Sequence, residues 1–289
     1  MVIVVKTIDI ICPLYNAEKY IENLHKSFLM QEKVKINKIR YVLTESSDKT
    51  EEYLINNKID YKKIKASEFS HSYTREEQAF ESNADIVVFV TQDVVIENND
   101  WLYELTKDIN DKDIVACYSR QISKYNNIEK YTREFNYPDY DFVVFNDDLK
   151  EKGLKTFFFS DASGAISTKI FKEVNGYDQK RLPISEDMYI IYKIIMKGYK
   201  VKYCSKSIVY HSHNFTLKQI YDRYKLTGKF FKENDYLDQY GTTGSGAKLA
   251  KYVLKRIFQE FRLLLLFRYP FDMAARLFGM KVGKINERK

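Results

Sequence analysis

Four clusters of polar side chains follow apolar runs, at points where the strands of a sheet are expected to end. They are Pro13-Leu14-Tyr15-Asn16, residues 44–50 (TESSDKT), Thr91-Gln92-Asp93 and Ser185-Glu186-Asp187. In open α/β sheets, ligands bind beyond the carboxyl ends of the strands, so these side chains are candidates for one shared site.

The first two clusters suit a nucleotide. Tyr15 can stack on a flat ring, and Asn16 is expected to open a helix whose amides face a diphosphate. Glu45 can accept a hydrogen bond from a nucleobase, while the hydroxyl groups beside it suit a ribose. Taken alone, each cluster is equally a turn that leads into a helix, with Asn16 and Asp48 as the caps.

The remaining clusters carry carboxylates and imidazoles. Asp93 can hold a divalent ion that bridges two phosphates, since hard cations prefer oxygen ligands, or it is a polar residue leaving the core. One of Glu186 and Asp187 can act as a general base, although adjacent acids also complement a helix dipole. His211 and His213 share one face of a strand and are candidate metal or phosphate ligands, or polar loop residues.

A repeating β-α pattern must position these clusters. We expect strands at residues 8–12, 39–43, 61–66, 86–90 and 113–118, and helices from Asn16, at 49–57 and 75–82, and from Asp100. The uniformly apolar run at residues 86–90 is typical of a parallel strand that is covered on both faces. The pattern predicts an α/β fold with a doubly wound, mostly parallel central sheet flanked by helices.

The second half is less regular. Residues 119–160 are interpreted as a long, partly ordered excursion, and residues 241–246 (GTTGSG) as a flexible linker. Between them we expect helices at 167–174, 186–197 and 216–233, and short strands at 200–203 and 208–210.

Composition narrows the class of protein. Hydrophobic residues make up 45% and charged residues 30%, a balance that is typical of a globular protein. The 10 Gly and 4 Pro are too few for a low-complexity or collagen-like chain. Three cysteines far apart predict neither a disulfide framework nor a zinc site, and they favour a reducing compartment. The clean apolar runs are too short to cross a membrane, and the N-terminus is interpreted as a first strand and not as a signal peptide.

Taken together, the clusters H-x-x-T-R, TQD, ED and YHSHN resemble family 2 glycosyltransferases of the GT-A fold. The likeness is greatest to bacterial rhamnosyltransferases of capsule or cell-wall polysaccharide synthesis. It covers about residues 8–232, including ICPLYNAEKYI, FSHSYTREEQAFESNADIVVFVTQDVVIENNDWL, FFSDASGAISTKIFKEVNGYD and SEDMYIIYKIIMKGYKVKYCSKSIVYHSHN. Only the combination is specific.

The resemblance implies an inverting sugar transfer from a nucleotide sugar, dTDP-rhamnose in the favoured interpretation. It assigns roles to these residues: Pro13, Tyr15, Asn16, Glu45, Arg75 and Gln92 around the nucleotide; Asp93 with His211 and His213 at Mg²⁺ or Mn²⁺; Asp187 as base, supported by Glu186; Ser163 and Gly164 at the acceptor. Two departures stand out. TQD keeps one carboxylate of the usual DxD motif, and TESSDKT replaces the usual acid-acid-Gly-Ser nucleotide loop.

The predicted linker also indicates a domain division. Residues 1–240 form the catalytic domain, with a nucleotide-binding half at about 1–118 and an acceptor half at 119–240. Residues 241–289 form the linker and a basic, amphipathic helical tail. From Lys248 onward there are 11 Lys and Arg against 3 Asp and Glu, a net charge of +8. The whole chain has a net charge of +7, so the first 247 residues sum to −1 and the basic character belongs to the tail.

The tail has several possible partners. Tyr252, Ile257, Phe261, Leu264 and Leu265 are expected to form one apolar face. Such a basic helix fits an anionic membrane, which would bring the site to a lipid-linked saccharide acceptor. The alternative is a helical pair packed on the catalytic domain or on a second copy in a homodimer, whereas nucleic acid is not an expected partner. The predicted location is therefore cytoplasmic and peripheral, on the inner face of the cell membrane.

Two other functions remain open. The same fold can use UDP-glucose, UDP-galactose or a UDP-N-acetylhexosamine as the donor. A non-catalytic, glycosyltransferase-like partner subunit is the second alternative, which the Glu186-Asp187 pair disfavours. A nucleotidyltransferase is excluded because residues 12–20 lack the glycines of a phosphate loop.

Overall fold

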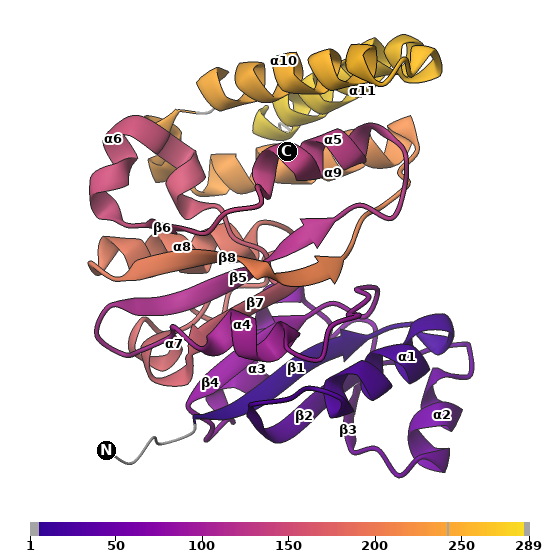
Figure 1. Ribbon diagram of the computed structural model, residues 1–289, viewed down its shortest axis with the longest axis vertical. Helices are drawn as coiled ribbons and strands as arrows, with labels where there is room; N and C mark the ends of the chain where they lie inside the picture. The colour runs from indigo at the N-terminus through magenta and orange to yellow at the C-terminus, as the bar shows by residue number, and fades with distance from the viewer. Residues whose placement is uncertain (1–5, 242, 286–289) are drawn as a thin grey trace.

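A mixed, mostly parallel sheet of eight strands runs through the molecule (Figure 1). The computed structural model describes residues 6–241 and 243–285. The strand order is β3-β2-β1-β4-β7-β5-β8-β6, in which β7 is antiparallel to β4 and β5, and β6 is antiparallel to β8. The strands are β1 (Thr7–Leu14), β2 (Lys35–Thr44), β3 (Tyr61–Ile64), β4 (Ile86–Val90), β5 (Ile114–Ile122), β6 (Phe142–Val144), β7 (Ser163–Ser167) and β8 (Lys200–Tyr210). The predicted fold class is confirmed.

Helices cover both faces of this sheet. They are α1 (Glu18–Leu29), α2 (Thr50–Asn56), α3 (His71–Phe80), α4 (Trp101–Thr106), α5 (Ile128–Asn136), α6 (Leu149–Lys152), α7 (Thr168–Glu173), α8 (Glu186–Met196), α9 (Leu217–Glu233), α10 (Thr243–Gln259) and α11 (Leu263–Lys284). Alternate residues of β4 enter two separate cores, Val88 with α1 and α4, and Phe89 with α7 and α8. All five β4 residues are buried, as a strand covered on both faces requires.

Several predicted boundaries move. The 119–160 segment is more ordered than predicted, since β5 extends to Ile122 and the segment then forms α5, β6 and α6. The two short strands predicted at 200–210 are one strand, β8, which pairs with β5 through an irregularity near its middle. Asn16 does not cap α1. Its φ of 46° turns it away from the helix, and its side-chain oxygen accepts a hydrogen bond from the Ser47 amide at 2.9 Å.

The tail is a helical pair packed on the rest of the chain. The predicted linker is wrong over residues 243–246, because α10 begins at Thr243; Thr242 lies outside the described residues. Val253 and Ile257 of α10 share a core with Tyr131 of α5, and Arg256 is paired with Glu134 at 2.9 Å. The packing alternative for the tail is therefore observed within this chain.

α11 lies directly against α9 (Figure 1). Gly279 and Gly283 of α11 pack against α9, and Gly228 of α9 packs against α11. A Cβ on any of these three glycines would overlap backbone atoms of the partner helix. Small residues at such a contact let two helix backbones approach closely. No helix in the described ranges is long and apolar enough to cross a bilayer.

Candidate active site

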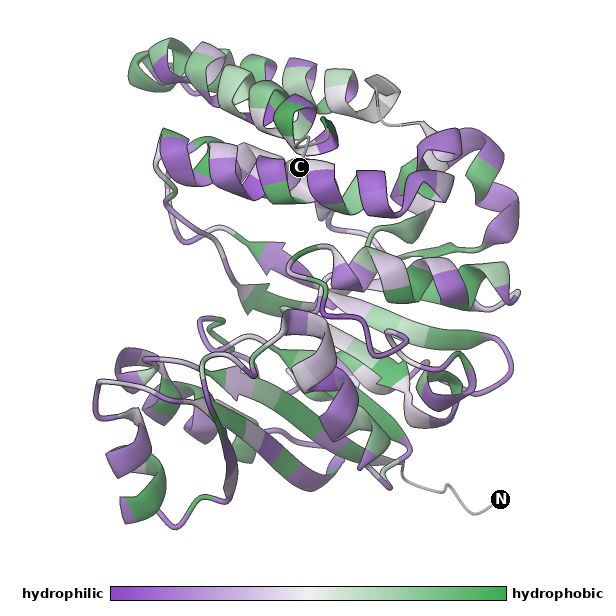
Figure 2. Ribbon diagram, turned by 180° about the vertical axis from the view of Figure 1, so that it is seen from behind, coloured by the Kyte–Doolittle hydropathy of each residue, from purple (hydrophilic) through white to green (hydrophobic). Residues whose placement is uncertain are grey.

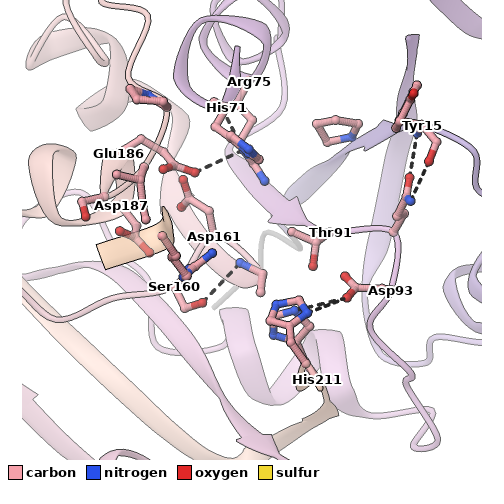
Figure 3. A pocket seen from close by; sticks show the side chains of 18 of the residues that line it. Tyr15, His71, Arg75, Thr91, Asp93, Ser160, Asp161, Glu186, Asp187 and His211 are labelled. Atoms are coloured by element: carbon pink, nitrogen blue, oxygen red, sulfur yellow. Dashed lines mark hydrogen bonds and ion pairs between the residues drawn. The ribbon is translucent and has the colours of Figure 1, made fainter. Parts of the chain in front are cut away.

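A cavity of about 900 Å³ opens at the carboxyl ends of β1 and β4. Its walls come from the N-termini of α3 and α8, from α9, and from the segments that follow β4 and β8. Figure 3 shows Asp93 and His211 at one end, and Glu186, Asp187 and Asp161 at the other. The expectation that separate polar clusters meet in one site therefore holds for the third cluster, for the histidines, and for Pro13, Leu14 and Tyr15 of the first cluster. The fourth cluster also reaches the site, but from the N-terminus of α8 and not from the end of a strand.

Asp93, His211 and His213 form the candidate metal end. Asp93 Oδ2 lies 3.5 Å from His211 Nε2 and 3.7 Å from His213 Nδ1. The three ligand atoms lie within 4.8 Å of one another, and within the described ranges this group alone has a metal-ligand arrangement. One carboxylate and two imidazoles, all facing the same point, fit a divalent cation.

Hydrogen bonding orients His211 for such a role. Its Nδ1 lies 3.0 Å from Gln121 Oε1, which also accepts a hydrogen bond from Arg133. Gln121 Nε2 donates to Ser160 Oγ at 2.7 Å, and this fixes the carbonyl end of the amide toward His211. His211 Nδ1 therefore donates to Gln121, which leaves Nε2 as the ring nitrogen that faces Asp93.

The protonation states also suit metal binding. Burial alone would raise the pKa of Asp93, but the hydrogen bond and charge of His211, together with His213, hold this pKa well below its usual range. Burial, reinforced by His211, lowers the pKa of His213 to about 4. At neutral pH, Asp93 is thus ionised and His213 is neutral, as ligands must be.

The predicted nucleotide-binding residues separate into two groups. Pro13, Tyr15, Arg75, Gln92 and Asp93 line the cavity. Gln92 holds the backbone of Tyr15 at both ends, accepting from its amide at 2.7 Å and donating to its carbonyl at 2.8 Å. These two hydrogen bonds fix the backbone of Tyr15, so its exposed ring is held beside the candidate metal end.

Asn16 and Glu45 lie outside the cavity lining. Asn16 holds the loop at residues 44–50 through Ser46 and Ser47, and Glu45 is an exposed residue just beyond β2. The prediction that they surround the nucleotide stays a prediction, and the structure gives them no place in the cavity wall.

The opposite end holds a buried ion pair next to the candidate base. Arg75, only 2% exposed, donates to Glu186 Oε1 at 3.3 Å and to the His71 carbonyl at 2.7 Å. Asp187 is half-buried one residue further on, at the N-terminus of α8. Burial, and then the charges of Glu186 and Asp161, raise the pKa of Asp187 well above its usual range.

Asp161 is a cavity residue that the sequence analysis missed. It is buried, its Oδ2 accepts a hydrogen bond from the Tyr177 hydroxyl at 2.7 Å, and its Oδ1 has no partner in the part of the chain that the structure describes. Burial raises its pKa to about 7, with Glu186 acting in the same direction and Arg75 opposing it. Asp161 and Glu186 thus place two carboxyl groups beside the guanidinium of Arg75, whereas Arg223 of α9 is the guanidinium that acts on Asp187.

Ser163 and Gly164 are not in the cavity wall. They belong to β7, between β4 and β5, and both are buried. Ser163 Oγ accepts from the Trp101 indole at 3.0 Å, and a Cβ on Gly164 would meet the Phe159 ring at 2.5 Å. Both residues serve the packing of the sheet, which leaves no room for the predicted contact with an acceptor. Instead, α9 supplies Arg223, Tyr224 and Thr227 to the cavity on that side.

Comparison with known proteins gives consistent matches. Residues 9–175 match the family model described as Glycosyl transferase family 2. The chain is 32% identical over 226 residues to the O-antigen chain rhamnosyltransferase WbaN of Salmonella anatum, covering 76% of this chain and 71% of that protein. It is 29% identical over 283 residues to the O-antigen chain rhamnosyltransferase RfbN of Salmonella typhimurium, covering 96% and 89%.

The fold has solved counterparts. The mannosyltransferase PcManGT from Pyrobaculum calidifontis, solved in complex with GDP-Man and Mn²⁺, superposes with a TM-score of 0.63 at 14% identity. The match covers 96% of this chain and 88% of that one. At this identity the likeness concerns the fold.

Proposed function

The chain belongs to glycosyltransferase family 2, and from that premise we propose that it is an inverting rhamnosyltransferase of surface polysaccharide synthesis. In this proposal it moves L-rhamnose from dTDP-rhamnose to a saccharide or lipid-linked saccharide acceptor. Two relatives are O-antigen chain rhamnosyltransferases, and their alignments cover most of this chain and most of each relative. This supports the choice of donor and of pathway class.

One observation carries the proposal. A single cavity contains three candidate ligands for a cation at one end and, at the other, a carboxyl group whose pKa is raised. An inverting transfer needs both groups in one site. The leaving nucleoside diphosphate gains negative charge at one end, and the acceptor hydroxyl loses a proton at the other.

At the donor end, Tyr15 and Gln92 would contact the nucleotide, with Pro13 beneath it. Asp93, His211 and His213 would hold Mg²⁺ or Mn²⁺, which when bound neutralises charge on the diphosphate. Arg75 lies toward the other end of the cavity, where it is paired with Glu186.

At the other end, Asp187 would accept the acceptor's proton as the hydroxyl oxygen attacks the anomeric carbon opposite the leaving diphosphate. A base works best when its pKa lies near the working pH. Burial, and then the negative charges of Glu186 and Asp161, raise the pKa of Asp187. Glu186 also ties the N-terminus of α8 to Arg75. We include a cytoplasmic location in the proposal, since Cys12, Cys117 and Cys204 are free thiols.

The test is Asp187→Asn. The amide keeps the shape of the side chain but cannot accept the proton, so kcat should fall about 10²–10⁴-fold. Donor affinity, measured by calorimetry, should change less than about twofold, because the nucleotide lies at the other end of the cavity. A variant of normal kcat would refute the assignment of the base.

A further inference from the structure

The outward face of α11 is an exposed apolar stripe. Leu264, Phe267, Phe271 and Phe278 recur at spacings of three, four and seven residues, and each is more than half exposed. Ile285, the residue directly after the helix, is also exposed. At 100° per residue the four helix positions fall within roughly a sixth of the helix circumference. Gly279 and Gly283, which pack on α9, lie outside this arc. Figure 2 shows the two tail helices as markedly more hydrophobic than α9 beneath them.

The turn between α10 and α11 extends the stripe. Phe258 is 56% exposed and Phe261 is 86% exposed, so two aromatic rings stand in solvent next to Leu264. The predicted single apolar face of the tail is thereby divided: Ile257 is buried against α5, while Phe261 and Leu264 face outward. Monomeric proteins rarely expose apolar surface of this extent unless it meets a partner or a membrane.

The charges around the stripe point to the kind of partner. Lys248, Lys251 and Lys255 of α10 and Lys281 of α11 are exposed, and none takes part in an ion pair within the described ranges. Two tail acids are described, and both are neutralised inside the chain. Glu260 pairs with Lys130 and Arg256, and the buried Asp272 pairs with Arg276.

We propose that this surface, the α11 stripe with the α10–α11 turn and its lysines, docks on an anionic phospholipid bilayer, with the aromatic rings at the headgroup boundary. Apolar side chains flanked by free cations are what such a surface recognises. A second copy of the chain fits less well, because pairing two stripes would bring lysines together, and the described part of the tail offers no exposed acid to meet them.

Docking in this orientation would bring the cavity near a lipid-linked acceptor. Docking itself does not rest on the proposed function. α9 lies between α11 and the cavity: its Tyr221 and Gly228 contact α11, and its Arg223 and Thr227 line the cavity. The cavity is therefore one helix layer away from the proposed membrane surface, within reach of an acceptor that is held in the bilayer by a lipid.

Vesicle co-sedimentation tests the proposal. The wild-type protein should bind vesicles of phosphatidylcholine and phosphatidylglycerol in equal parts, should bind pure phosphatidylcholine at least about tenfold more weakly, and should be released by salt. Phe267→Ser with Phe271→Ser should reduce binding about tenfold or more, and so should Lys251→Glu with Lys255→Glu. Leu29→Ser, which removes an exposed leucine from α1, is the matched control and should bind like the wild type.

Each contrary result has a defined meaning. Equal binding by the Phe267 and Phe271 double variant, or no binding of the wild type to either vesicle, overturns the proposal. A wild-type dimer in light scattering that the same variant dissociates would assign the stripe to a second copy instead. Nucleotide release from the donor in solution is measured in parallel, since failure of the proposed function would appear there and failure of docking would not.

Discussion

The contact between α9 and α11 allows a quantitative prediction. In the double variant Gly279→Ala/Gly283→Ala, each new methyl group meets backbone atoms of α9. The Cβ on Gly279 would lie 2.5 Å from the Tyr221 carbonyl oxygen, and the Cβ on Gly283 would overlap the Lys225 carbonyl oxygen more severely. Backbone atoms cannot rotate aside as a flexible side chain can, so the two helices must separate.

The magnitude follows from two opposing effects. Overpacking costs about 2–3 kcal/mol at each site when the neighbour is rigid. Alanine returns about 1 kcal/mol at each helical position relative to glycine. The double variant should therefore lose about 2–4 kcal/mol of the free energy of unfolding, or roughly 4–8 °C in Tm.

Thermal and urea unfolding, followed by circular dichroism, measure this loss. The matched control is Gly244→Ala/Gly246→Ala in α10, where a new Cβ meets no atom within 4 Å. The control should be as stable as the wild type or more stable. A Gly279→Ala/Gly283→Ala protein with wild-type stability would refute the packing of α11 on α9, and with it the position of the apolar stripe.

Two further predictions concern the cavity. The base must be deprotonated, and the pKa of Asp187 is raised. The acidic limb of the pH profile of kcat/KM should therefore lie well above pH 4, with activity rising as the pH rises and lost on acidification. Asp161→Asn removes a neighbouring negative charge and should move that limb down by about one pH unit; an unmoved limb would contradict this coupling. Gln121→Leu frees His211 from its orienting partner and should weaken Mn²⁺ affinity, measured by calorimetry without donor, about 10–100-fold. Gln121→Glu keeps the acceptor oxygen and should retain most of the affinity, and equal loss in both variants would reject the orienting role.

The sheet and the metal end of the site were predictable from the sequence, whereas Glu186 and Asp187 reach the site from the N-terminus of α8 and not from a strand end. The run at residues 86–90 is apolar throughout, and its end carries Asp93; His211 and His213 follow β8, which is parallel to β5. Strand ends converge in any such sheet, so these groups meet without knowledge of the packing.

Other features depend on contacts between distant segments. Asp161 owes its environment to Tyr177 and to Arg75, neither of which is a sequence neighbour. Its only signal was an acid inside the aromatic stretch FFFSDASGA. Ser163 was predicted to contact the acceptor because nothing local indicates that β7 enters the sheet antiparallel between β4 and β5.

The tail shows how packing overrides local preference. Glycines at 244 and 246 favour a flexible linker in isolation, yet α10 includes both, since the rest of that helix is held on α5 by a shared core and ion pairs. Conversely, Gly279 and Gly283 are needed for close approach, which the sequence alone does not reveal.

Donor discrimination tests the central claim most directly. The purified protein is mixed with dTDP-rhamnose, UDP-glucose, UDP-galactose or UDP-N-acetylglucosamine, with and without Mn²⁺ or Mg²⁺, and Tm and slow nucleotide release are recorded. The account predicts stabilisation and release with dTDP-rhamnose alone, dependent on the divalent ion and on Asp93. A response to a UDP-sugar in its place would contradict the rhamnosyl assignment, and no response to any donor would contradict the assignment of this cavity as the donor site.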